Sequence, residues 1–377
     1  MRKRVAVGAW LVAVVLLAVS LVPGMAPRLA GLLPDDGGFP QRIGFIRGAP
    51  MLPDKPGPLA VVIDDNNFGN GGQEAVGRDG REWTLPTTQA PALSPDGSRV
   101  ALLVRRTVEI RDLTEGTSTS WPAPGNDRVS TGSIHSLLAF MPDQTHLLVW
   151  MWGRTHGWTA LLDVATGVLV RAEVNARPVG VTADGEIVVL RAREDTLTVV
   201  MLDSRLAEVR RFTLAPVSGW TSDPRDVGMI APDGGLVVPD GDRGALVLRR
   251  FSLDDGTETT DLNTTVSGRS FSGSNCRLTW RGDDPVVITK SYGSQAKAVQ
   301  IHPDGSTTQL LAIHHRMQSN CVTFAADALE AGPHWSFLGA NDAVWTWYWR
   351  PLLLILLVAG GVVWWVVSRR RRGRSRP

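Results

Sequence analysis

The sequence predicts an all-β protein, in which a six-bladed β-propeller ectodomain is flanked by two transmembrane helices. Three observations predict it. A strand–turn–strand unit recurs six times between residues 92 and 332, a second turn follows within most units, and an apolar run with basic neighbours lies near each end of the chain. With 43% apolar and 20% charged residues, the 377-residue chain has ample material for a core, which excludes a disordered chain.

The apolar runs at the two ends predict membrane spans. Residues 5–22 are apolar throughout and follow MRKR, and residues 352–367 are apolar and precede SRRRRGRSR. A spanning helix needs about 20 residues, so the second run is expected to recruit the tryptophan-rich stretch upstream of it. The expected segments are a cytoplasmic head (1–4), a signal-anchor helix (5–23), a linker (24–57), the propeller (58–340), a second transmembrane helix (344–367) and a basic cytoplasmic tail (368–377).

Basic residues flank both runs on the side away from the middle of the chain. The positive-inside rule places such flanks in the cytoplasm. We therefore expect a cell-membrane protein with both termini cytoplasmic and the central domain extracytoplasmic. The alternative for the first run is a cleaved signal peptide, although Pro27 directly after Gly24-Met25-Ala26 disfavours cleavage there. Both alternatives give the central domain the same location.

The charge of the middle of the chain excludes one class of partner. The chain has 39 Lys and Arg against 37 Asp and Glu. Nine of the basic residues lie in the first four and last nine positions, and Arg350 is a tenth beyond residue 344, which leaves 29 basic against 37 acidic residues in 24–344. Because phosphate neutralisation requires clustered positive charge, we expect no nucleic-acid partner.

Six turns that contain an aspartate define the repeat. The turn residues are Asp96, Asp143, Asp184, Asp233, Asp283 and Asp327, and their spacings are 47, 41, 49, 50 and 44 residues. The mean of about 46 is typical of one four-stranded propeller blade. Pro, Asp and Gly in these turns preset the backbone for a hairpin.

A second turn, 16 to 21 residues after the first, completes four strands in five of the units. These turns are DLTEG, DVATG, DSRLA, DDGTE and DGSTT, which begin at Asp112, Asp163, Asp203, Asp254 and Asp304. The sixth unit, TFAADALEAG, lacks its later strands, whereas residues 59–85 contain strands that belong to no other unit. We expect residues 59–85 to complete the sixth blade, which removes exposed sheet edges. The extra segment is too short for a seventh blade.

The repeat resembles the bacterial WD-repeat-like propellers that carry an S-P-D-G turn between the first two strands of each blade. The resemblance covers about residues 58–340 and rests on Ser94-Pro95-Asp96-Gly97, Pro142-Asp143, Ala183-Asp184-Gly185 and Pro232-Asp233-Gly234. The terminal Trp-Asp dipeptide of that family is absent from every unit. The resemblance implies a ring used for binding and assembly, with catalysis in a minority of members.

The two cysteines are the only residues to which we assign a site, a disulfide bond. Cys276 and Cys321 both lie in the exported region, and each ends a Ser-Asn-Cys string just before the turn of its unit. They are expected in the first strands of the fifth and sixth blades, and an oxidising compartment favours a bond between them. The alternative is two unlinked buried thiols. Two isolated cysteines offer no zinc framework.

No catalytic, cofactor-binding or metal-ligating residue is expected, and no cofactor. The seven histidines show no metal-ligand spacing, and no nucleophile elbow or phosphate loop is present. The acidic loop 63–74 contains oxygen ligands that calcium prefers, but its spacing departs from the calcium-binding loop, which favours a solvated turn. The tryptophans Trp150, Trp152 and Trp158 are either a ligand-contacting rim or, as we expect, blade core.

The sequence therefore favours an extracytoplasmic binding or scaffolding module at the cell envelope, whose partner is a protein or an envelope polymer of unknown identity. The alternative is a propeller enzyme, a hydrolase or lyase, with its site at the central channel. Fold alone does not separate the two classes.

Overall fold

A computed structural model gives the structure of the protein. It describes residues 37–43, 49–65, 73–87, 91–104, 107–123, 135–152, 157–172, 177–193, 196–214, 229–240, 245–259, 265–267, 279–289, 296–313 and 319–334. Both apolar runs lie outside these ranges. Within them, no helix is long and apolar enough to cross a membrane.

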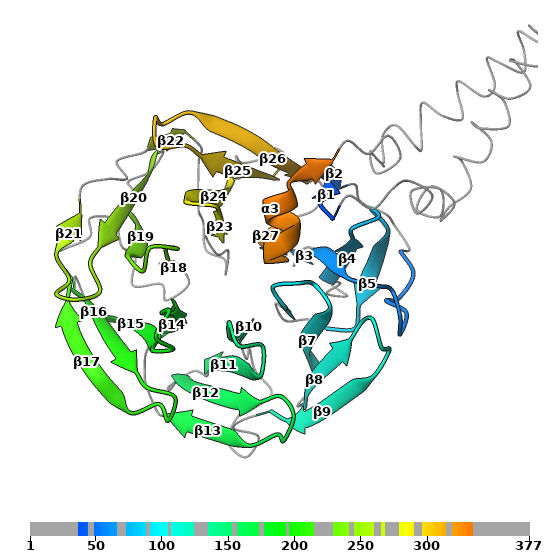
Figure 1. Ribbon diagram of the computed structural model, residues 1–377, viewed down its shortest axis with the longest axis horizontal. Helices are drawn as coiled ribbons and strands as arrows, with labels where there is room; N and C mark the ends of the chain where they lie inside the picture. Colours follow the sequence, from blue (N-terminus) through cyan, green and yellow to red (C-terminus); the bar gives the residue numbers. More distant parts are fainter. Residues whose placement is uncertain are drawn as a thin grey trace, which may run out of the picture.

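The described residues form six β-sheets of four or five strands arranged around a ring, which confirms the six-bladed propeller (Figure 1), and one further sheet of two short strands. Blade 1 contains β6 (Ala92–Leu93), β7 (Arg99–Val104), β8 (Thr107–Asp112) and β9 (Ser118–Pro122). Blade 2 contains β10 (His135–Phe140), β11 (His146–Trp152), β12 (Gly157–Asp163) and β13 (Leu169–Ala172). Blade 3 contains β14 (Arg177–Val181), β15 (Ile187–Arg193), β16 (Thr196–Leu202) and β17 (Glu208–Thr213).

The other three blades depart from a simple four-stranded meander. Blade 4 contains β18 (Met229–Ile230), β19 (Leu236–Asp240) and β20 (Ala245–Phe251). Two further short strands, β21 (Glu258–Thr259) and β22 (Thr265–Ser267), both pair with β20. Blade 5 contains β23 (Thr279–Arg281), β24 (Asp284–Thr289), β25 (Ala296–Ile301), β26 (Thr307–Ile313) and, as a parallel edge strand, β2 (Arg42–Ile43). Blade 6 contains β27 (Ser319–Phe324), β3 (Leu59–Asp65), β4 (Gln73–Gly77) and β5 (Glu82–Leu85).

Each blade packs both faces of its sheet against its neighbours, because side chains alternate along a strand. In β15, Val188 and Leu190 join the cluster shared with blade 4, whereas Ile187 and Val189 join the cluster shared with blade 2. The second strands therefore read as continuous apolar runs. The core of the protein is a series of layers between blades.

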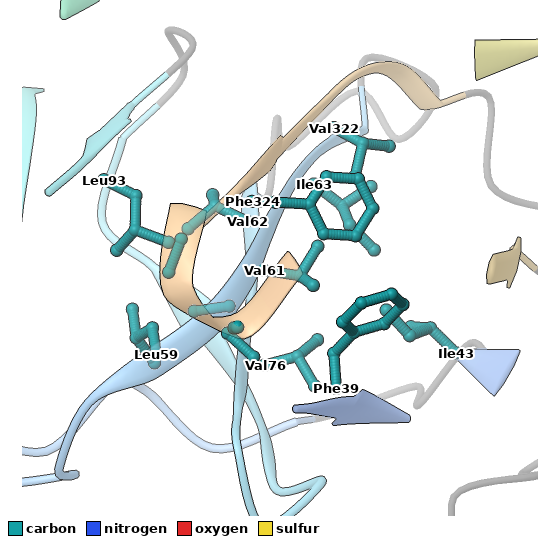
Figure 2. Packing of buried hydrophobic residues seen from close by; sticks show 14 of the residues in the cluster. Phe39, Ile43, Leu59, Val61, Val62, Ile63, Val76, Leu93, Val322 and Phe324 are labelled. Atoms are coloured by element: carbon teal, nitrogen blue, oxygen red, sulfur yellow. The ribbon is translucent and has the colours of Figure 1, made fainter. Parts of the chain in front are cut away.

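The ring closes as the sequence predicts, with an N-terminal segment in the last blade. Strand β27 pairs antiparallel with β3, where Val322 lies opposite Ile63 and Phe324 opposite Val61. Figure 2 shows these residues in one buried cluster with Phe39. Residues about 260 positions apart in sequence thus share one sheet and one core.

The close approach of blade 1 to blade 6 requires a glycine at the first turn. Gly97 has a φ of +71°, and a Cβ there would lie 2.0 Å from the carbonyl oxygen of Leu59. The backbone N–H of Leu59 donates to the Gly97 carbonyl at 2.9 Å. Only glycine combines this conformation with this contact at little cost.

One part of the repeat prediction is wrong. The sixth unit was expected to continue as turn and strand, but helix α3 (Ala326–Ala331) follows β27, and Asp327 lies in its first turn. The second strand position in blade 6 is already filled by β3, so this segment has no strand to pair with. Its alanine, leucine and glutamate residues favour a helix instead.

Part of the segment expected to be a linker is ordered against the ring. Strand β1 (Phe39–Pro40) pairs in parallel with β28 (Pro333–His334), β2 extends blade 5, and Met51 forms a parallel bridge with Thr84 of blade 6. Phe39 and Ile43 are almost completely buried. These residues belong to the propeller structurally.

Candidate functional site at the turn face

The aspartate turns lie on one face of the ring, which we call the turn face. In an antiparallel four-stranded sheet, the connection between the first two strands and the connection between the last two lie at the same end of the strands. The turn face therefore contains Asp96, Asp143, Asp184, Asp233 and Asp283 in the first turns, and Asp112, Asp163, Asp203, Asp255 and Asp304 in the second turns.

The turn aspartates accept hydrogen bonds from the backbone of their own turns. Asp112 Oδ1 accepts from the N–H groups of Thr114 (3.0 Å) and Glu115 (2.8 Å). In blade 4 the acceptor is Asp255, one residue after the position that the sequence predicted, and it binds the N–H of Thr257 at 3.0 Å. These carboxylates organise turns.

The same hydrogen bonds lower the pKa of several turn carboxyls. The Glu115 N–H lowers the pKa of Asp112, and the Thr166 N–H lowers the pKa of Asp163, because each bond favours the charged form. Hydrogen bonds from Ser306 also lower the pKa of Asp304. The bond from the Ser306 side chain has the larger effect, and the bond from the Ser306 backbone N–H has the next. The turns thus favour ionised aspartate.

We expect the ring to lose stability in acid. The folded pKa of these carboxyls lies below the ordinary value of 3.8, so the unfolded chain binds more protons as the pH falls. The stability that these ionised aspartates contribute to the folded ring is present above pH 3.8, and it is lost as the pH falls through their folded pKa. Denaturant unfolding between pH 7 and pH 3 measures it, and the double variant Asp112→Asn, Asp163→Asn should show a shallower dependence. An identical dependence in the variant would contradict the assignment.

A chain of polar side chains crosses blade 5 on the turn face. The Asp284 Oδ2 atom lies 2.6 Å from His302 Nδ1, and His302 Nε2 lies 2.8 Å from Thr308 Oγ1. The Gln300 Nε2 donates to the same Asp284 oxygen at 2.8 Å, and Arg281 donates to the Gln300 Oε1 at 3.3 Å. Carboxylate, imidazole and hydroxyl therefore stand in one hydrogen-bonded row.

Such a row orients a histidine base next to a hydroxyl, as hydrolases do. Its position does not fit the expected enzyme site at the central channel, because Asp284 is on the second strand of the blade and Thr308 is on the fourth. Two nearby N–H groups are also engaged, that of Gly305 with the His302 carbonyl and that of Ser306 with Asp304. The geometry therefore supports a structural role, in which the row joins strands β24, β25 and β26 by side-chain hydrogen bonds.

Sequence reasoning missed this row because its members are far apart in the chain. Register brings them together: Val286 lies opposite Gln300, and Gln300 lies opposite Thr308. The only signal in the sequence was a histidine two residues before the turn residue Asp304. Among the described residues, no group of three or more His, Cys, Asp or Glu could hold a metal ion.

The remaining sequence candidates lie partly outside the described ranges. Cys321 is in β27, where its backbone pairs with Asp64, whereas Cys276 lies outside the described residues, so the disulfide stays a prediction. Trp150 is 2% exposed and its ring lies 5.3 Å from the Arg177 guanidinium carbon, which makes it core rather than rim. Residues 66–72 of the acidic loop also lie outside these ranges.

Comparisons with known proteins found similarity to solved structures alone. No protein-family profile and no curated protein matches this sequence. Among solved structures, TolB from Acinetobacter baumannii is similar, with 16% identity and a TM-score of 0.46 over 71% of this chain, which covers 66% of the length of that TolB. A putative TolB from Agrobacterium tumefaciens (16% identity, TM-score 0.42, 74% of this chain and 95% of that one) and virginiamycin B lyase from Staphylococcus aureus (10% identity, TM-score 0.41, 67% and 88%) are also similar.

Proposed function

We propose that the protein is a membrane-anchored extracytoplasmic propeller that binds or organises a protein or polymer of the cell envelope. The two apolar runs with their basic flanks support the anchoring, and the net negative charge of residues 24–344 supports a partner other than nucleic acid. Residues 5–23 and 344–367 supply the two spans.

One observation carries the proposal: the two ends of the described ring lie side by side. Phe39 pairs with Pro333 in the parallel pair β1–β28, so the first and last described residues of the ring, Gly37 and His334, lie at one short two-stranded ribbon. That place is on the turn face, because Asp327 of α3 donates its backbone N–H to Pro95 in the first turn of blade 1. Two spans attached at one point tether one face of the ring, and the other face is presented to a partner.

A protease-protection experiment tests the anchoring. In intact spheroplasts that carry the full chain with a C-terminal tag, added protease is expected to digest residues 40–340 and to spare the tag. Removal of the tag would overturn the arrangement, because it would place the basic tail outside the cell.

Capture of crosslinked complexes from detergent-solubilised membranes tests the binding role. A chain that lacks residues 59–85 keeps both apolar runs but loses three strands of blade 6, so it serves as the control. A partner recovered with the full chain and lost with the control supports the proposal. Identical material from both chains would contradict it.

A further inference from the structure

The described residues 37–43 and 49–57, which we call the strap, lie along three blades. Strand β2 pairs with β26 of blade 5, and the N–H of Leu52 donates to Thr84 of blade 6 at 3.0 Å. The N–H of Gly57 donates to the Leu113 carbonyl of blade 1 at 3.2 Å. The strap therefore joins the closing blade to both of its neighbours.

The strap begins in a parallel ribbon with the C-terminal end of the ring. Phe39 lies opposite Pro333 and Pro40 opposite His334. Backbone hydrogen bonds from Phe39 to Gly332 (3.2 Å) and from Gln41 to His334 (3.1 Å) join the two strands. Because the strands are parallel, the chain enters β1 and leaves β28 at opposite ends of the ribbon.

This direction decides how the ribbon carries force. Tension between the two ends pulls the strands past each other along their common axis, so the hydrogen bonds between them are loaded together. In an antiparallel ribbon with both ends at one side, the same tension would open the bonds one after another. The covalent path between Gly37 and His334 runs through all six blades, whereas the ribbon joins the ends directly.

Buried and charged contacts fasten the ribbon to the ring. Phe39 is 0% exposed, and its ring packs edge-on against Phe324 of β27 with centroids 5.0 Å apart. Arg78 donates through Nη1 to the Gly37 carbonyl (3.2 Å) and through Nη2 to the Asp96 carbonyl (2.7 Å). The same Nη2 lies 2.6 Å from the Asp327 carboxylate of α3.

We propose that the β1–β28 ribbon, with Phe39 and the Arg78 contacts, is a mechanical lock that carries tension between the two membrane tethers past the blades. This proposal rests on the proposed function for the origin of the tension, because the two membrane-anchored spans supply it. The lock itself is a property of the ring. While the ribbon holds, tension between Gly37 and His334 passes through the ribbon and its contacts with blade 6, and it does not pass around the ring through blades 1 to 5.

Force spectroscopy on the full chain tests the lock. The chain is held in detergent micelles by handles on its two termini, and the lifetime of the first opening is measured at constant force. Phe39→Ala is expected to shorten this lifetime by at least about tenfold, since deletion of a buried phenylalanine accelerates unfolding where the removed contacts bear the load. The matched control is Phe251→Ala in blade 4, which removes an equally buried ring.

The two variants give opposite expectations. The lock is supported if Phe39→Ala shortens the first lifetime and Phe251→Ala leaves it unchanged. It is overturned if Phe39→Ala has no effect, or if both variants shorten the lifetime equally, because the load would then pass through the blades. Should Phe39→Ala fail to fold, Arg78→Gln tests the same contacts, with Arg211→Gln as its control, which breaks the exposed ion pair to Glu208 in blade 3. The measurement in micelles does not depend on topology in cells, so a wrong topology and a wrong lock give separate results.

Discussion

A chain that lacks residues 59–85 is expected not to form the ring. The deletion removes β3, β4 and β5, three of the four strands of blade 6. It also removes nine buried apolar residues: Leu59, Ala60, Val61, Val62, Ile63, Ala75, Val76, Trp83 and Leu85. At about 1.5–3 kcal/mol for each of the seven large apolar side chains, the loss of about 10–21 kcal/mol is as large as the 5–15 kcal/mol by which a typical domain is stable, or larger.

Thermal unfolding followed by circular dichroism measures this effect in the purified proteins. A matched deletion of residues 37–58 removes the strap but leaves all four strands of blade 6, so it should lower the melting temperature by less. The deletion of 59–85 should abolish the cooperative transition, because β27 would remain as an unpaired edge. A transition like that of the full chain would show that this segment is not the closing element.

The second large effect is expected from the predicted disulfide bond between Cys276 and Cys321. Strand β27, which contains Cys321, holds the ring closed through its pairing with β3. A bond that closes the loop from 276 to 321 should stabilise the protein by about 4 kcal/mol on the chain-entropy estimate, less any strain. It would fasten the closing strand to the chain segment that enters blade 5.

Unfolding with and without a reductant measures the effect, and the double variant Cys276→Ser, Cys321→Ser is the control. The full chain should lose stability on reduction, and the double variant should be unaffected. Mass spectrometry of the unreduced, alkylated protein identifies the bond. Recovery of both cysteine peptides singly labelled, with no linked peptide, would refute it.

The turn chemistry explains why the fold was predictable. Pro95, Asp96 and Gly97 act locally, since each residue sets the backbone of its own turn, and local rules can be read from neighbouring residues. The period of about 46 residues then gave the number of blades. The same turn pattern misled at Asp327, because whether a strand follows depends on whether a partner strand is free.

The strap and the polar row of blade 5 illustrate what escaped prediction. Nothing in the short strand Arg42–Ile43 indicates that it pairs with β26, about 270 residues later, and Asp284 and His302 come together only through strand register. The role of Arg78 likewise depends on its hydrogen bonds to three residues far from it in the sequence, Gly37, Asp96 and Asp327.

The sequence by itself determined the all-β class, the six-fold repeat, the turn positions in blades 1 to 5 and the closure by residues 59–85, because each follows from local turn formers and from alternation along single strands. Only the tertiary structure decided that a helix follows the last strand, that β2 and Met51 pair with the outer strands of blades 5 and 6, and that the two ends of the ring run in parallel. Those features depend on which strand edges remain unpaired once the ring has closed. Whether an edge is unpaired is decided by the assembled sheets and cannot be read from one strand.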